Sequence, residues 1–184
     1  MKKSTKIWLI ILVVVLGWLG LSYNSLVTGR EGVDNKWAQI DTQLQRRYDL
    51  IPNLVSTVKG VTAQEQTVFG QLAEARTQYA GASNPEARAT AANSVESSLG
   101  RILMIMENYP ELRSSEAFRD LMTALEGSEN RVGVARKDYN DAVTSLNARI
   151  ARFPSNIVAG IFSIDKRSYF GKSEGAGEVP VVKF

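Results

Sequence analysis

The side chains of this 184-residue chain that could do chemistry are its carboxylates, because the sequence contains no Cys and no His. That absence removes thiolate nucleophiles, zinc-finger ligand sets and imidazole acid–base catalysis together. Acids three residues apart share one helix face. Three such pairs occur, namely Glu31/Asp34, Glu126/Glu129 and Asp138/Asp141.

Paired carboxylates on helices are one half of a ferritin-like di-metal site, which also needs a Glu-x-x-His motif from each of two helices. Without His that signature is missing, so we interpret the acids as solvated helix faces. Their expected partners are the nearby basic residues Arg131, Arg136 and Lys137. The sequence therefore predicts no catalytic residue, no metal site and no cofactor.

Glycine, arginine and aromatic residues could also provide binding chemistry. A phosphate-binding loop is not indicated, since Gly127, Gly133 and Gly160 are isolated and none follows a strand. The pair Arg46-Arg47 either binds an anionic headgroup or a partner's carboxylate, or is simply solvated or paired with Asp49. The aromatic residues at helical spacing are interpreted as core rather than as a cofactor cage: Trp37, Tyr48, Phe69, Phe118 and Tyr139.

The net charge of +3 comes from the N-terminus alone. Removing Lys2, Lys3 and Lys6 from the 22 basic residues leaves 19, which equals the number of acids, and no acid occurs before Glu31. The rest of the chain lacks the basic stripe that phosphate neutralisation requires. We expect no nucleic-acid partner.

An uncharged run begins directly after these lysines. Ile7 to Leu21 contains only apolar residues and Gly, and the uncharged stretch continues to Val27. As a helix, about 21 residues span about 31 Å, enough to cross a hydrocarbon core. Trp8, Trp18 and Tyr23 lie near its ends, where aromatics favour the interface. Residues 1–27 are predicted to be a basic tail and transmembrane anchor in the lipid bilayer; the alternative is a cleaved secretory signal peptide.

Charge counting gives an expectation about orientation. Lys2, Lys3 and Lys6 flank one end of the run, whereas Arg30 and Lys36 lie near the other. The positive-inside rule then keeps the N-terminus in the cytoplasm and places the body outside. The margin is three against two, so a cytoplasmic body stays open.

Residues 28–163 have the apolar period of long helices. The first stripe runs through Leu26, Val33, Trp37, Ile40, Leu44 and Ile51, and Pro52 interrupts it, either starting a new helix capped by Asp49 or kinking a continuous one. We predict further helices at 50–79, from Asn84-Pro85 to about 108, and from Ser114 or Ser115 to about 153. The fold class predicted is all-α: a single transmembrane helix followed by an elongated antiparallel up-and-down four-helix bundle with a coiled-coil-like repeat.

The chain after Pro154 differs in composition. Residues 156–162 are expected to form a short helix that covers one end of the bundle. Residues 164–184 are expected to be a flexible C-terminal tail, Gly-rich at 172–177, extended at 179–184, and pinned by Phe170 and Phe184.

Several segments together resemble the LemA family of bacterial membrane proteins. The most specific is the string Arg46 to Val55, RRYDLIPNLV. Others are Tyr23 to Leu44, Glu129-Asn130-Arg131, Ala135-Arg136, Tyr139-Asn140, Asn147, Phe153-Pro154, Tyr169-Phe170, Pro180 and Phe184. The resemblance implies a single-pass anchor, a four-helix bundle on the cytoplasmic side and no established enzymatic activity. Where family members often carry a Tyr and a His-Glu, this chain has Val61 and Gln64-Glu65.

Two functional hypotheses follow. The leading one is a non-catalytic membrane-anchored interaction or scaffold module at the bacterial cell membrane, whose partner is an unidentified protein or a second copy of the chain. Its candidate partner surface is Arg46, Arg47, Asp49, Pro52 and Asn53, although this segment could equally just set a helix junction. The rival is a carboxylate-dependent metal-binding or hydrolytic enzyme, which would need acids from separate helices to converge inside the bundle.

Overall fold

The computed structural model describes residues 3–59 and 66–171, which are helical without any strand. The all-α prediction is confirmed. The helices in the described ranges are α1 (Lys3–Tyr48), α2 (Ile51–Lys59), α3 (Gln66–Gly81), α4 (Pro85–Met106), α5 (Pro110–Ser114), α6 (Glu116–Ala151) and α7 (Ser155–Ile161). The chain forms two compact units: residues 1–36 with 138–168, and residues 37–137 with 169–184. Helices α1 and α6 each contribute to both.

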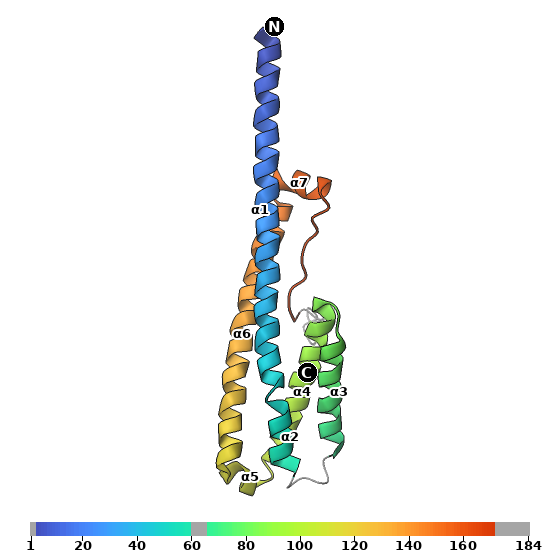
Figure 1. Cartoon of the computed structure of the whole chain (residues 1–184), viewed down its shortest axis with the longest axis vertical. Coiled ribbons are helices and arrows are strands. Elements are labelled where there is room, and N and C mark those ends of the chain that lie inside the picture. Colours follow the sequence, from blue (N-terminus) through green and yellow to red (C-terminus); the bar gives the residue numbers. More distant parts are fainter. Residues whose placement is uncertain (1–2, 60–65, 172–184) are drawn as a thin grey trace, which may run out of the picture. The chain divides into compact units, whose positions relative to one another are not determined.

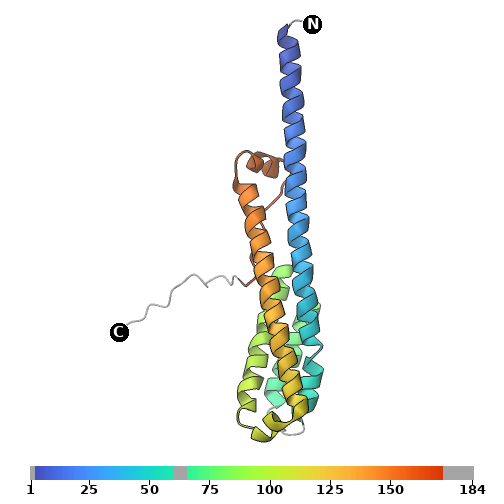
Figure 2. The ribbon, with the colours of Figure 1, turned by 90° about the vertical axis from the view of Figure 1, so that its left-hand side faces the viewer.

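In the first unit, α1 and the C-terminal part of α6 run antiparallel, and α7 lies beside α1 (Figures 1 and 2). Leu26 and Val33 of α1 and Val143 and Leu146 of α6 are fully buried. Gly29 allows the close approach, since a Cβ there would lie 3.2 Å from Leu146 Cδ1. The α1 stripe predicted from the sequence is confirmed at every position except Trp37, which is half-buried, and Val143 adds to the predicted core.

The N-terminal part of α1 has no such cover. Side chains from Ile7 to Leu16 are 45–71% exposed. Within the described residues, this helix is the one long and apolar enough to cross a membrane, with a mean hydropathy of 2.0 and none of that stretch buried. The predicted apolar segment is thus a single helix that continues without a break into the body.

The second unit is an antiparallel bundle. Figure 1 shows the end of α1 followed by α2, then α3, α4 and α6 running alternately in opposite directions. The predicted core positions of α4 and α6 are buried: Val95, Leu99, Ile102, Met106, Phe118, Leu121, Leu125, Ser128, Val132 and Ala135. The up-and-down four-helix prediction is confirmed, with α1 and α2 together forming the first leg.

The predicted helix over 50–79 is wrong. The structure has two helices there, α2 and α3, which point in opposite directions in Figure 1, and residues 60–65 lie outside the described ranges.

At Pro52 the structure is closer to a kink in a continuous helix than to the start of a separate helix, which were the two predicted alternatives. Helix α1 ends at Tyr48, and α2 begins at Ile51 and continues in roughly the same direction (Figure 1). Asp49 does not cap α2; its carboxylate accepts a hydrogen bond from Gln45 Nε2 at 3.0 Å. Pro52 lies in the first turn, where its missing N–H costs no hydrogen bond.

Other boundaries follow the predicted signals. The Asn84 carboxamide oxygen accepts from the Ala87 N–H at 2.7 Å with Pro85 in the first turn, and Ser115 Oγ accepts from the Phe118 N–H at 3.4 Å. Helix α4, predicted to run to about residue 108, ends at Met106 with Glu107 as its C-cap, and Pro110 opens the short α5.

Two expectations about the C-terminal region need correction. The short helix α7 belongs to the first unit, where its neighbour Phe162 packs on Tyr23 of α1. The tail predicted to be flexible from 164 contains two buried residues, Ile164 and Phe170. Phe170 pins this segment as predicted, against Trp37 at 5.7 Å and under the Arg136 guanidinium at 4.8 Å. Phe184 and residues 172–184 lie outside the described ranges.

Candidate functional site

The candidate partner surface lies in the second unit, where α1 ends and α2 begins. Arg46, Asp49, Pro52 and Asn53 are exposed. Arg47 is different, with only 9% of its surface exposed. For the four exposed residues, a role in partner binding stays a prediction. The Arg47 side chain faces the bundle and contacts other helices instead.

Arg47 belongs to a charge network between three helices. Its Nη1 forms an ion pair with Glu129 Oε2 of α6. On the same side of α6, Arg136 Nη2 donates to Glu96 Oε2 of α4 at 3.0 Å. This network was not predicted from the sequence, because apolar spacing cannot show which polar residues lie beside the buried contacts between helices. Partners within α6 were predicted for its acids, whereas Glu129 and Asp138 pair with Arg47 and Lys36 of α1.

Glu96 is the titratable centre of the network. Burial alone would raise the pKa of its carboxyl, but the hydrogen bond and charge of Arg136 and the charge of Arg47 outweigh burial and lower the pKa below its ordinary value. Glu96 is therefore a charged structural partner at neutral pH. A carboxylate used as a general base would instead need its pKa raised toward neutrality.

A cavity of about 440 Å³ adjoins this network. Carboxylates from two helices, Glu96 of α4 and Glu126 and Glu129 of α6, line it beside the apolar side chains Leu99, Leu103, Met122 and Leu125. Acids from separate helices do converge here. Glu126 is nevertheless exposed, as expected of a solvated face, and the Glu129 side chain is 41% exposed. Arginines neutralise two of the three, and no group of three or more acids in the described residues has metal-binding geometry.

In each of the other two acid pairs, one member forms an ion pair with a basic side chain from elsewhere in the chain. Asp34 pairs with Arg167 Nη2 at 2.9 Å, and Asp138 pairs with Lys36 Nζ at 2.9 Å, both within the first unit. Glu31, Glu126 and Asp141 are exposed. The i,i+3 spacing thus brought residues to one helix face without making them partners of one another.

A second polar cluster joins α1, α3 and α4 in the second unit. The Tyr79 hydroxyl donates to Asp41 Oδ1, which also accepts Arg88 Nη1 at 2.8 Å. The Tyr48 ring meets the Tyr79 ring edge-on at 4.5 Å. Burial raises the pKa of Tyr48, and burial with the Asp41 hydrogen bond raises that of Tyr79. Both phenols stay protonated at neutral pH, so Tyr79 acts as a structural donor.

Tyr48 is buried as predicted, and so are Phe118 and Tyr139. The remaining two predicted core aromatics, Trp37 and Phe69, are only half-buried.

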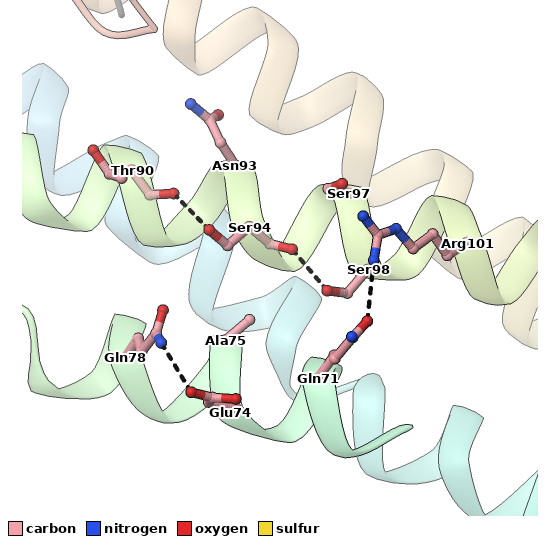
Figure 3. A pocket seen from close by; sticks show the side chains of 10 residues that line it. All are labelled: Gln71, Glu74, Ala75, Gln78, Thr90, Asn93, Ser94, Ser97, Ser98 and Arg101. Carbon is pink, nitrogen blue, oxygen red and sulfur yellow. Dashed lines mark hydrogen bonds between the residues drawn. The ribbon is translucent and has the colours of Figure 1, made fainter. Parts of the chain in front are cut away.

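A further cavity of about 480 Å³ lies between α3 and α4, and its walls are polar (Figure 3). Three of its hydroxyl groups, those of Thr90, Ser94 and Ser98, donate to carbonyls of their own helix. Arg101 donates to Gln71 at 3.1 Å. The remaining lining side chains include no pairing of a nucleophile with a base. We assign no chemistry to it.

The geometry described is that of a helical protein with paired charges, and comparison with known proteins fits it. The LemA family model matches residues 36–184. The chain belongs to the LemA family. The resemblance read from the sequence is confirmed, and the match begins after the apolar part of α1.

Named proteins similar to this chain are distant from it in sequence. Magnetosome proteins MamQ 1 and MamQ 2 of Paramagnetospirillum magneticum are each 27% identical over 196 residues, covering 92% of this chain and 72% of theirs. Protein LemA of Metamycoplasma hominis is 21% identical over 152 residues, covering 82% of this chain and 69% of its own length. None of these names states a reaction.

Proposed function

We propose that this LemA-family chain is a non-catalytic, membrane-anchored helical bundle that acts as an interaction or scaffold module at the bacterial cell membrane. The observation that carries the anchor is the contrast within α1. Leu26, Val33, Ile40 and Leu44 are at most 1% exposed, whereas the apolar side chains from Ile7 to Leu16 are 45–71% exposed. Exposing such a run to water is costly, and a hydrocarbon core removes that cost.

The anchor is tested by extraction of bacterial membranes with alkaline carbonate. The full-length chain is expected in the pellet. Replacing Val13 and Val14 by Asp should release it, since an acid near the centre of a transmembrane helix costs about 2.5–3.5 kcal/mol per residue. Glu126→Ala, on an exposed position of α6, is the matched control and should stay in the pellet. Release of the unaltered chain, or a mature N-terminus near Tyr23, would refute the anchor.

The scaffold role is supported by the junction of α1 and α2. Arg46, Asp49 and Asn53 present exposed charge and amide groups on backbone that the Arg47–Glu129 ion pair ties to α6. A protein partner is the expected ligand of this surface. A photo-crosslinking amino acid at Asp49 or Asn53 should give one discrete adduct in living cells. The same label at exposed Thr123 of α6 is the control, and equal adducts from all three positions would reject the surface.

The rival hypothesis of a carboxylate-dependent enzyme is supported by one observation, the convergence of Glu96, Glu126 and Glu129 on one cavity. Against it, Arg136 and Arg47 pair with Glu96 and Glu129, so the site has little negative charge left for a cation. Elemental analysis and titration of the purified full-length chain with Mn²⁺ and Zn²⁺ decide between them. Stoichiometric binding that Glu126→Gln abolishes would favour the enzyme.

A further inference from the structure

The outward side of α7 is apolar. Ile157 and Ile161 are one helical turn apart and are 50% and 65% exposed, and the flanking Phe153 and Phe162 are 79% and 52% exposed. The inward side is also apolar, with Val158 and Ala159 buried. A surface helix facing water normally presents polar side chains outward. Here the exposed side needs a cover other than water.

The position of α7 indicates which cover. The Phe162 ring lies 4.5 Å from the ring of Tyr23, which follows the apolar run ending at Leu21. Figure 1 shows α7 lying across α1 at this level, and Figure 2 places it beside α1 as well. A helix that crosses the direction of a transmembrane helix lies along the membrane surface. Tyr and Trp side chains favour that boundary.

The C-terminus of α7 is capped by a Schellman motif, and buried Val158 and Ala159 pack α7 against the first unit. The Ile164 N–H donates to the Ala159 carbonyl at 2.9 Å, and the Ser163 N–H donates to Gly160 at 3.4 Å. Ser163 has the positive φ of 50° that this motif requires. Ile164 is buried, as is usual for the residue after the turn. The apolar side of α7 is therefore fixed by the fold and is not a loosely attached segment.

Charge around α7 suits an anionic lipid surface. Residues 154–164 contain no charged side chain. Exposed Arg152 precedes them, and exposed Asp165 and Lys166 follow them, so the basic charge is clearest on the Arg152 side. Arg149, one turn earlier in α6, reaches Ser25 Oγ of α1 at 3.3 Å, just past the apolar run. Basic residues flanking an apolar helix face are typical of interfacial helices.

We infer that α7 is an interfacial helix that inserts Phe153, Ile157, Ile161 and Phe162 into the lipid surface beside the anchor. This inference rests on the proposed function of α1 as a membrane anchor. The first unit would then hold the bilayer at two places, the transmembrane part of α1 and the crosswise α7. Rotation and tilt of α1 become fixed relative to the membrane surface.

Because the chain has no Cys, single-cysteine variants of the full-length protein report local environment directly. An environment-sensitive fluorophore is attached at Ile161→Cys in α7 and at Leu12→Cys in the anchor. Ser145→Cys, an exposed position of α6 in the same unit, is the aqueous control. The labelled chains are reconstituted in vesicles of phosphatidylethanolamine and phosphatidylglycerol. Quenching is measured with iodide in the water and with nitroxide lipids labelled at shallow and deep positions.

The expected result is several-fold weaker iodide quenching at Ile161→Cys than at Ser145→Cys, with strong quenching by the shallow nitroxide. Leu12→Cys should respond best to the deep nitroxide. Iodide access at Ile161→Cys equal to that at Ser145→Cys, with Leu12→Cys still in lipid, overturns the interfacial helix and leaves the anchor standing. Protection of Ile161→Cys from both quenchers means a protein cover and also overturns it. Iodide access at Leu12→Cys overturns anchor and interfacial helix together.

Discussion

Arg47 of α1 and Glu129 of α6 form an ion pair inside the second unit, with the Arg47 side chain 10% exposed and that of Glu129 41% exposed. The neighbouring residue Arg46 is exposed. Two adjacent arginines, indistinguishable in the sequence, therefore have different physical tasks. One ties helices together, and the other is available to a partner.

This difference predicts unequal effects of the same substitution. Arg47→Ala leaves Glu129 without its charged partner and should lower the free energy of unfolding by about 1–3 kcal/mol. Arg46→Ala, the matched control, should change it by less than about 0.5 kcal/mol. Urea unfolding of the detergent-solubilised chain measures both. Equal effects would show that the ion pair does not stabilise the bundle.

Stability should also depend on pH through Glu96. Its carboxyl has a lowered pKa in the folded protein, so the folded state binds this proton less readily than the unfolded one. Its contribution is complete above the unfolded carboxyl pKa of about 4.3 and is lost as pH falls through the lower folded pKa. Glu96→Gln should flatten the acid limb of the urea midpoint against pH. Glu126→Gln, at an exposed acid, is the control, and an unchanged limb in Glu96→Gln would contradict the assignment.

The buried seam of α6 gives a third prediction. Leu121→Ala or Leu146→Ala should each cost about 2–5 kcal/mol, because a cavity is left in the core. Asp138→Ala should cost about 0–1 kcal/mol, since its ion pair with Lys36 is partly exposed, and Glu126→Ala should cost no more. Thermal and urea unfolding compare the two classes. Similar losses would mean that the helix faces are wrongly assigned.

The fourth prediction concerns the orientation of the chain in the membrane. Lys2, Lys3 and Lys6 lie next to the apolar run and should be retained in the cytoplasm, which places the body outside. A phosphatase fusion after Phe184 should then be active and a β-galactosidase fusion inactive, and neutralising the three lysines should weaken or invert this. The reverse pair of activities would place the bundle in the cytoplasm, as the family resemblance implies.

The sequence by itself predicted most of the helices and which side of each helix is buried. Apolar periodicity placed Val95, Leu99 and Ile102 in the core, and Asn84-Pro85 marked a helix start. The uncharged run contained the exposed apolar stretch from Ile7 to Leu16. These are local properties, because a helix face and a cap depend on residues within about one turn.

Only the tertiary structure decided which distant residues meet. Arg47 turned inward to Glu129, and Arg136 met Glu96 from another helix. Residue types cannot reveal such pairs, since many basic and acidic residues are chemically equivalent and helix packing selects among them. The tertiary structure also decided two other features. The chain reverses direction between α2 and α3, and the end of α7 packs against Tyr23. Apolar spacing tells which side of a helix is buried, but the helix it packs against is set by the folded chain as a whole.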